Sequence, residues 1–209
     1  RSTSQISGQI IHLQKLYGAD LINFNSVFLG EHDGLGSDRR TLLSAIHEAI
    51  DKLYLNKSWC PGSNIFLFGS VFSLLNTPIS VFDELASVGS DIYINIGLES
   101  ADQQTLEQLG KPLTAREIDE AFRLVQDINE RYSTIEITVN FVTDDSLSQN
   151  HYRALLALVR DRIPRRKSKG CVYLSPLSFG SPSRAQLFSF YKLKAQSRVP
   201  LFLYTIQRL

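Results

Sequence analysis

The sequence contains no methionine, one tryptophan and two cysteines among its 209 residues. The two cysteines, Cys60 and Cys171, lie far apart, which argues against a disulfide-stapled scaffold because such scaffolds need several cysteine pairs. The same scarcity is typical of a reducing compartment, and we expect a cytoplasmic protein. A sequence that begins with Arg1 and lacks methionine is expected to be a fragment, or the ordered part of a longer polypeptide.

A surplus of charge of either sign is also lacking. Lys and Arg number 22 against 21 for Asp and Glu, which gives a net charge of +1. Binding to nucleic acid or to an anionic membrane surface relies on a basic excess, so the charge gives no signal for either partner. The densest basic run, at 162–169, is most simply a solvated loop. No apolar run reaches the roughly 20 residues of a membrane helix, and the first residues show no signal-peptide pattern.

The residues that are present favour a folded α/β domain. Hydrophobic residues make up 43% and aromatic residues 10% of the chain, enough for a sizeable core. Apolar spacing predicts helices at 4–17, 40–54, 81–88, 115–130, 150–163 and 188–197. Short apolar runs predict strands at 21–29, 64–68, 92–96, 134–142, 171–174 and 200–206.

This alternation of strands and helices predicts a parallel sheet with helices packed outside it. Five or six strands fit the sequence, so we expect a partial, TIM-like (β/α) barrel in a single domain over 1–209, with 184–209 as a C-terminal extension. Right-handed crossovers would place all the strand ends on one rim. Those ends are polar or rich in glycine, and they fall at 30–31, 69–70, 97–100, 140–145 and 175–183.

The most informative stretch is DIYINIGLESADQQTLEQLGK at 91–111. Its apolar strand runs to Gly97, and Glu99 and Ser100 follow immediately. A helix is predicted to start there, with Ser100 as its N-cap and Gln103 three residues later. In parallel α/β folds ligands are held where a strand ends and a helix begins, so this stretch predicts a binding site.

The helix predicted at 115–130 has the clearest pattern in the chain. Thr114 can cap it and Glu117 completes a capping box. Its apolar side chains recur at helical spacing and are expected to form one buried stripe. These residues are Ile118, Ala121, Phe122, Val125 and Ile128.

Four strand-end segments together resemble the radical S-adenosylmethionine (radical SAM) enzymes, read from their second strand onward. VFLGEHDGL is similar to the segment that ends the second strand of that family, and GLESADQQTLEQLGKPLT to the one that ends the fourth. ITVNFVTDD resembles the fifth strand and YLSPLSFGSP the sixth. The resemblance covers roughly residues 2–183, and the GLES segment with its leucine-rich continuation is its most distinctive part.

The resemblance implies a set of contacts to SAM at the strand ends. Gly30 and Glu31 would hold the amino group, although Leu29 replaces the first glycine of the family motif and His32 its proline. Glu99 and Ser100 would lie near the ribose or the carboxylate of SAM, with Lys111 as a partner for the carboxylate. The remaining candidates are Asn140 at the end of the fifth strand, and Ser175 and Ser178 in the loop that packs against adenine or substrate.

The resemblance also implies cofactors and partners. Members of the family bind SAM next to a [4Fe–4S] cluster and use an electron from flavodoxin or ferredoxin to form a 5′-deoxyadenosyl radical, which attacks a substrate that this sequence does not identify. The defining CxxxCxxC loop is absent, and Cys60 and Cys171 cannot replace it, because three thiolates on one loop are needed. We therefore expect the first strand and the cluster loop to be missing from these 209 residues, which alone should be inactive and bind SAM weakly.

Other interpretations stay open at this point. The chain could be a degenerate, non-catalytic barrel or binding module, or an unrelated (β/α)-barrel enzyme. Glu31 could be a solvated loop carboxylate, Glu99 an acid favoured by a helix dipole, and Lys111 an ordinary surface lysine. His32 and Asp33 could point to a metal or a general base, but no further histidine lies nearby in the sequence. No catalytic residue is assigned.

Overall fold

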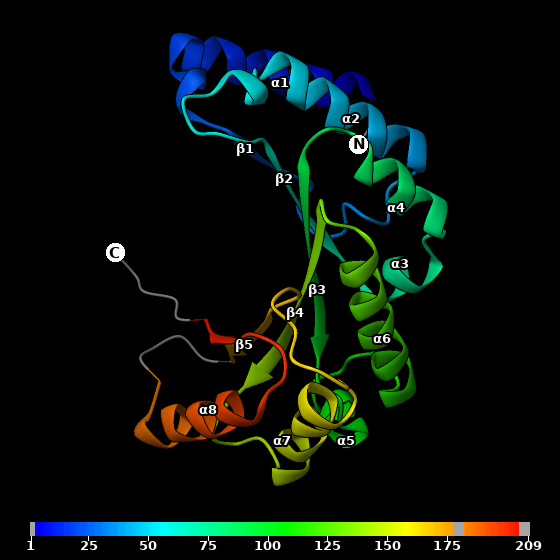
Figure 1. The fold of residues 1–209 in the computed structure, drawn as a ribbon, viewed down its shortest axis with the longest axis vertical. Helices are drawn as coiled ribbons and strands as arrows, with labels where there is room; N and C mark the ends of the chain where they lie inside the picture. The colour runs from blue at the N-terminus through cyan, green and yellow to red at the C-terminus, as the bar shows by residue number, and fades with distance from the viewer. Residues whose placement is uncertain (1–2, 178–181, 205–209) are drawn as a thin grey trace. The chain divides into compact units, whose positions relative to one another are not determined.

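The structure is a computed structural model that describes residues 3–177 and 182–204. The chain divides into two compact units, Arg1–Asn95 with Glu130–Glu136, and Ile96–Asn129 with Ile137–Leu209. Figure 1 shows the ribbon coloured from blue at the N-terminus to red at the C-terminus, with most helices and strands labelled. The prediction of a single partial-barrel domain stays a prediction, and each unit is described below by itself.

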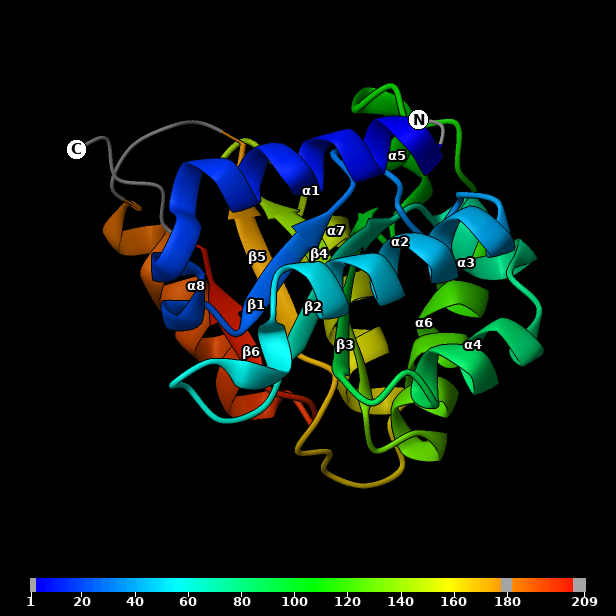
Figure 2. The same ribbon diagram turned by 90° about the horizontal axis from the view of Figure 1, so that it is seen from above.

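The first unit holds the N-terminal helices and the first two strands. Helices α1 and α2 lie side by side, as Figure 2 shows, and contact each other along their length. The elements of this unit are α1 Thr3–Tyr17, η1 Gly18–Asn23, β1 Ser26–Leu29, α2 Arg39–Lys52, η2 Leu55–Lys57, β2 Asn64–Gly69, α3 Val71–Asn76 and α4 Ile79–Ala86. Strand β3, Asp91–Glu99, starts in this unit and ends in the second.

The second unit holds the end of β3 and the elements that follow it, except that the last residues of α6 and the first of β4 belong to the first unit. These elements are α5 Gln103–Gln108, α6 Ala115–Arg131, β4 Ile135–Thr143, α7 Gln149–Leu156, the π-helical turn η3 Ala157–Asp161, β5 Val172–Pro176, α8 Arg184–Gln196 and β6 Leu201–Leu203. No helix in the described part of the chain has both the length and the apolar character needed to cross a bilayer.

Within the described residues six strands form a sheet in chain order, β1-β2-β3-β4-β5-β6. β1 pairs with β2 in parallel, and β4 with β5 and β5 with β6 likewise. The α/β class and the number of strands are therefore confirmed. Closure of this sheet into a TIM-like barrel stays a prediction.

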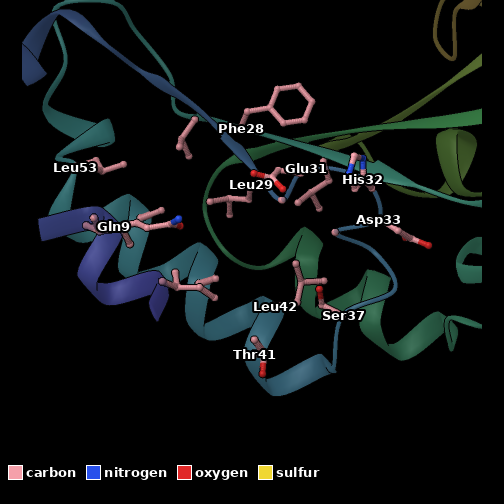
Figure 3. A pocket seen from close by; sticks show the side chains of 18 of the residues that line it. Gln9, Phe28, Leu29, Glu31, His32, Asp33, Ser37, Thr41, Leu42 and Leu53 are labelled. Atoms are coloured by element: carbon pink, nitrogen blue, oxygen red, sulfur yellow. The ribbon is translucent and has the colours of Figure 1, made fainter. Parts of the chain in front are cut away.

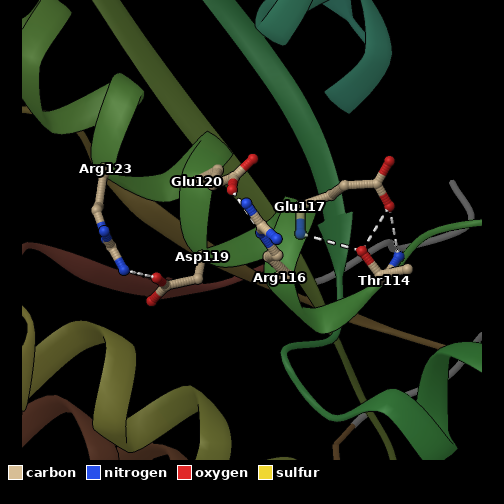
Figure 4. Close-up of polar contacts among 6 residues, drawn as sticks. All are labelled: Thr114, Arg116, Glu117, Asp119, Glu120 and Arg123. Atoms are coloured by element: carbon tan, nitrogen blue, oxygen red, sulfur yellow. Dashed lines mark hydrogen bonds and ion pairs between the residues drawn. The ribbon is translucent and has the colours of Figure 1, made fainter.

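The buried core follows the alternation of the strands and the stripe of α6. Along β3, Ile92, Ile94, Ile96 and Leu98 are buried and the residues between them are half-buried. The predicted stripe of α6 is buried in full. The capping box is confirmed as well, since Glu117 N donates to Thr114 Oγ1 at 3.2 Å and Thr114 N donates to the Glu117 carboxylate at 2.7 Å (Figure 4).

Several predicted boundaries are wrong, for local reasons. The strand predicted at 21–29 begins only at Ser26, because the chain first forms the short helix η1. The short helix α3, which Ser70 caps, was not predicted. The helix predicted at 150–163 ends at Leu156 and continues as a π-helical turn. At the end of α1, the apolar side chains of Leu16 and Tyr17 are exposed.

The predicted N-cap of α5 is also wrong. Asp102 caps this helix, since its carboxylate accepts from Thr105 N at 3.0 Å. Ser100 lies two residues earlier, and its hydroxyl accepts from Asp102 N at 3.0 Å. The helix therefore starts two residues later than predicted, and Ser100 belongs to the turn that precedes it.

Candidate functional site

In the first unit the end of β1 is a glycine-rich turn. Gly30 has φ +82°, a conformation that side-chain-bearing residues rarely adopt. Gly34 is buried, and a Cβ there would lie 3.0 Å from the Leu29 carbonyl oxygen, so only glycine fits without a shift of the backbone. The turn is tied to the end of β2 because Leu35 N donates to the Phe68 carbonyl at 3.1 Å. Glu31 lies in this turn and is exposed.

A cavity of about 460 Å³ lies beneath this turn, among α1, β1 and α2. Figure 3 shows Leu29 and Leu42 among the side chains that line it, with Glu31 and His32 at the strand end. The lining is mainly apolar, and Gln9, Ser37 and Thr41 add a few polar groups. The cavity therefore lies next to the turn that carries Glu31, and Glu31 is one of its lining residues.

The carboxylate of Asp33 is taken up by the turn itself. It accepts from Gly36 N at 2.9 Å and from the Ser70 hydroxyl at 2.6 Å, and Ser70 caps α3. Among the described residues no group of three or more His, Cys, Asp or Glu side chains could hold a metal ion. The geometry of Asp33 therefore fits a structural role in holding the turn.

In the second unit β3 ends in an unusual backbone conformation at Glu99. Its φ is +64°, and Tyr54 is the one other non-glycine residue with positive φ in the described chain. Ser100 N donates to the Leu98 carbonyl at 2.8 Å, which closes a three-residue turn around Glu99. Such a γ-turn with positive φ at its centre is rare and strained, and strain of this kind concentrates at functional sites.

The turn aims the Glu99 side chain back over its own strand, where it meets a lysine. Lys111 Nζ donates to Glu99 Oε1 at 3.0 Å, and the two side chains are 43% and 24% exposed respectively. A Cβ on Gly97 would lie 3.0 Å from Glu99 Oε1, so the glycine leaves room for the carboxylate. Glu99 is therefore half of an ion pair on a strand end, and it does not lie in the first turn of α5.

Ser100 is fully buried, and its hydroxyl contacts His151, a residue of α7 that is also fully buried. Ser100 Oγ lies 2.8 Å from His151 Nδ1, and His151 Nε2 lies 3.0 Å from the Val142 carbonyl oxygen. Burial lowers the pKa of His151, while the bond to Val142 and the charge of Asp102 oppose that shift. The ring is therefore held in its neutral form.

His151 was not among the site residues predicted from the sequence. A signal was present: His151 lies three residues after the α7 N-cap Ser148, and four residues before the buried Leu155. It thus occupies a position in the buried stripe of α7, where a polar side chain must find hydrogen-bond partners. What the sequence could not supply was the identity of those partners.

Two further candidates lie on neighbouring strands of the second unit. Asn140 is level with Tyr173, and Val142 with Ser175, in the parallel register of β4 and β5. Asn140 and Ser175 are half-buried and alternate with buried apolar residues, so both face away from the apolar core. Ser178 lies outside the described residues.

The structure thus groups the predicted residues within each unit. In the second unit it brings together Glu99, Ser100 and Lys111, and it places Asn140 and Ser175 on one face of adjacent strands. Gly30 and Glu31 share the turn of the first unit. Cys60 is exposed and Cys171 is half-buried, and neither forms a disulfide.

No family model matches the sequence, and no curated protein matches it. Several solved structures are similar to this chain, and two of them are described here. A radical SAM methyltransferase from Sphaerobacter thermophilus is 19% identical, with a TM-score of 0.48 over 78% of this chain and 47% of that chain. The apo form of OxsB, a cobalamin-dependent S-adenosylmethionine radical enzyme, is 19% identical, with a TM-score of 0.50 over 76% of this chain and 22% of that chain.

The chain therefore spans less than half the length of either structure. At this low sequence identity, structural similarity is evidence for a shared fold and not for a shared activity. The match to OxsB shows that this chain shares the fold of part of a radical SAM enzyme.

Proposed function

We propose that the chain is the core of a radical SAM enzyme, which binds SAM next to a [4Fe–4S] cluster and directs a 5′-deoxyadenosyl radical to a substrate. The shared fold supports this proposal, as does the order of the strand-end motifs along the chain. The observation that carries it is the strained end of β3, where Glu99 and Lys111 form an ion pair beside Gly97.

The chemistry of this pair matches two parts of SAM. A carboxylate accepts two hydrogen bonds from a ribose diol, which is the role we propose for Glu99. An ammonium binds a carboxylate, which is the role we propose for Lys111 toward the amino-acid end of SAM. The two side chains are partly exposed, so a ligand can reach both.

The other residues take supporting roles in this proposal. The hydroxyl of Ser100 faces into the protein, so Ser100 acts through the turn that it closes. Asn140 and Ser175 offer an amide and a hydroxyl toward adenine or substrate. Gly30 and Glu31 are the proposed contacts to the amino group of SAM.

The described residues do not fit an iron–sulfur cluster. They contain no group of three metal-ligating side chains, and the two cysteines belong to no such group. The proposed cluster would therefore take its ligands from residues other than those described. Radical formation belongs to the cofactors, whereas these residues bind and orient SAM.

The test uses the full-length gene product, reconstituted anaerobically with iron and sulfide. We expect the visible absorbance of a [4Fe–4S] cluster and, with dithionite as reductant, cleavage of SAM to 5′-deoxyadenosine. Glu99→Gln should weaken SAM binding about tenfold, because an amide is a poorer acceptor for the diol. Glu107→Gln on α5 is the control, since Glu107 is exposed and its carboxylate accepts a hydrogen bond from the Gln103 side chain.

A reconstituted protein that forms no cluster and binds no SAM would identify the chain as a degenerate, non-catalytic barrel or binding module. Equal effects of the two glutamine substitutions on SAM affinity would show that the end of β3 is not the binding site. SAM binding without a cluster would keep the ligand site and remove the radical chemistry.

A further inference from the structure

The hydrogen bonds of His151 define its tautomer. Nε2 faces the Val142 carbonyl, which can only accept, so Nε2 carries the proton. Nδ1 is then an acceptor, and the hydroxyl of Ser100 donates to it at 2.8 Å. Ser100 Oγ in turn accepts from Asp102 N at 3.0 Å. The buried ring thus joins the turn after β3 to the end of β4 with every polar atom satisfied.

This connection ends on the strained turn of Glu99. Ser100 N closes that turn by donating to Leu98, and the Ser100 side chain is anchored to His151 in the same residue. A left-handed φ at a non-glycine residue persists only when the surroundings hold it in place. Here two features hold Glu99. The buried hydroxyl of Ser100 anchors the residue that follows Glu99, and the space above Gly97, which has no side chain, accommodates the Glu99 carboxylate.

We propose that His151 is a positioning residue for the strand-end site. By holding Ser100 it keeps Glu99 in its left-handed conformation, and so keeps the carboxylate turned toward Lys111 and the ligand. This inference rests on the proposed function for its consequence, SAM affinity. Its structural claim, the conformation of Glu99, can be measured without any ligand.

Two conservative substitutions each keep one of the two hydrogen bonds of His151 and remove the other. In His151→Asn the amide oxygen can take the place of Nδ1 and still accept from Ser100. In His151→Gln the longer side chain can place an N–H near the position of Nε2 and still donate to Val142. If His151 acts through Ser100, the asparagine variant should retain the geometry of Glu99 and the glutamine variant should lose it.

Binding is measured with SAM on the reconstituted full-length protein. We expect His151→Gln to weaken SAM binding about tenfold and His151→Asn to leave it within about twofold of the parent. Ser100→Ala removes the same hydrogen bond, between Ser100 and His151, while His151 stays in place. Its loss of SAM affinity should therefore match that of His151→Gln, even if His151→Gln folds poorly. In the double variant the two losses should not add, because both remove one interaction.

The matched control is Asn129→Leu in the same unit. Asn129 is also buried, and its side chain also makes two hydrogen bonds. It accepts one from Ile137 N at 2.7 Å and donates one to the Ile137 carbonyl at 2.8 Å. Its removal should lower stability and leave SAM affinity unchanged. If affinity follows stability across all these variants, including this control, His151 is a packing residue and the proposal is wrong.

Two measurements on the unliganded protein complete the test. The ¹⁵N shifts of the His151 ring should report a protonated Nε2 and an accepting Nδ1. The intraresidue NOE between HN and Hα of Glu99 is strong at positive φ, where the two protons are close, and should be strong in the parent and in His151→Asn and weaker in His151→Gln. An unchanged NOE in His151→Gln overturns the proposal, whereas a weakened NOE in a protein that never binds SAM refutes only the proposed function.

Discussion

The two strand ends, after β1 and after β3, use glycine in different ways. At the first, Gly34 makes room for a backbone carbonyl, that of Leu29. At the second, Gly97 makes room for a side chain, the carboxylate of Glu99. The first glycine therefore shapes the fold, and the second shapes the direction of a functional group.

The acidic residues at these two strand ends, Glu31 and Glu99, also differ. Glu31 is exposed in its turn, whereas the side chain of Glu99 is only 24% exposed and pairs with Lys111. Water screens a partly buried charge less than an exposed one, so such a charge interacts more strongly with a ligand. We therefore expect the end of β3 to contribute more to SAM affinity than the end of β1, and substitutions at the end of β1 to act mainly on stability.

The largest loss of stability should come from Gly34→Ala. The new Cβ would meet the Leu29 carbonyl at 3.0 Å and Leu67 Cδ2 at 3.2 Å, so backbone must move in a buried place. The free energy of unfolding should fall by about 2 to 3 kcal/mol. Denaturation by urea measures it. Gly8→Ala on α1, where a Cβ meets nothing within 4 Å, should instead raise stability by up to about 1 kcal/mol.

The sequence predicted best what depends on local periodicity. The stripe and capping box of α6 and the buried alternation of β3 came from residues within one or two helical turns of each other. The N-cap of α5 was not predictable in this way, because Ser100 and Asp102 are both good caps. The choice follows from His151, 51 positions along the chain, which takes the Ser100 hydroxyl and leaves the cap to Asp102.

The candidate site shows the same limit. The GLES segment indicated that Glu99 matters, and the downstream lysine was predicted as a ligand partner without the ion pair that joins the two. The positive φ of Glu99 could not be predicted from its own residue type, since it results from contacts of Ser100. Likewise the short helix η1 replaced the start of a predicted strand whose apolar residues fit either structure.

A smaller loss is expected from Ser100→Ala. Removing the hydroxyl leaves His151 Nδ1 and Asp102 N without their partner in a buried place. The free energy of unfolding should fall by about 1 to 2 kcal/mol, which urea denaturation measures. Ser146→Ala in the same unit is the control, because the Ser146 hydroxyl is exposed and bonds to Asp144 on the surface. A loss no larger than that of the control would contradict the buried network.

Acid should weaken the second unit through His151. Its pKa is lowered by burial from the usual value of 6.5, so the folded protein holds the neutral ring while the unfolded chain binds a proton. The stabilisation is complete above the unfolded-state pKa of 6.5 and is lost as pH falls through 6.5 toward the lower pKa of the folded state. The free energy of unfolding, measured from pH 8 to pH 5 in steps of about one pH unit, should fall with pH in the parent and not in His151→Asn. A slope that survives the substitution would assign it to other groups.

The smallest effect on stability should come from the ion pair itself, although its effect on SAM binding is expected to be large. Glu99 and Lys111 are both partly exposed, so water screens their attraction, and Lys111→Gln should change the free energy of unfolding by less than about 1 kcal/mol. Lys111→Arg keeps the charge and should retain more SAM affinity than Lys111→Gln, because the ligand carboxylate still meets a cation. Lys192→Gln on α8 controls for the loss of one positive charge, because the Lys192 side chain is exposed. If Lys111→Gln lowers stability as much as Ser100→Ala while leaving SAM affinity unchanged, the pair holds the fold together, and the contrast between the two strand ends does not extend to ligand binding.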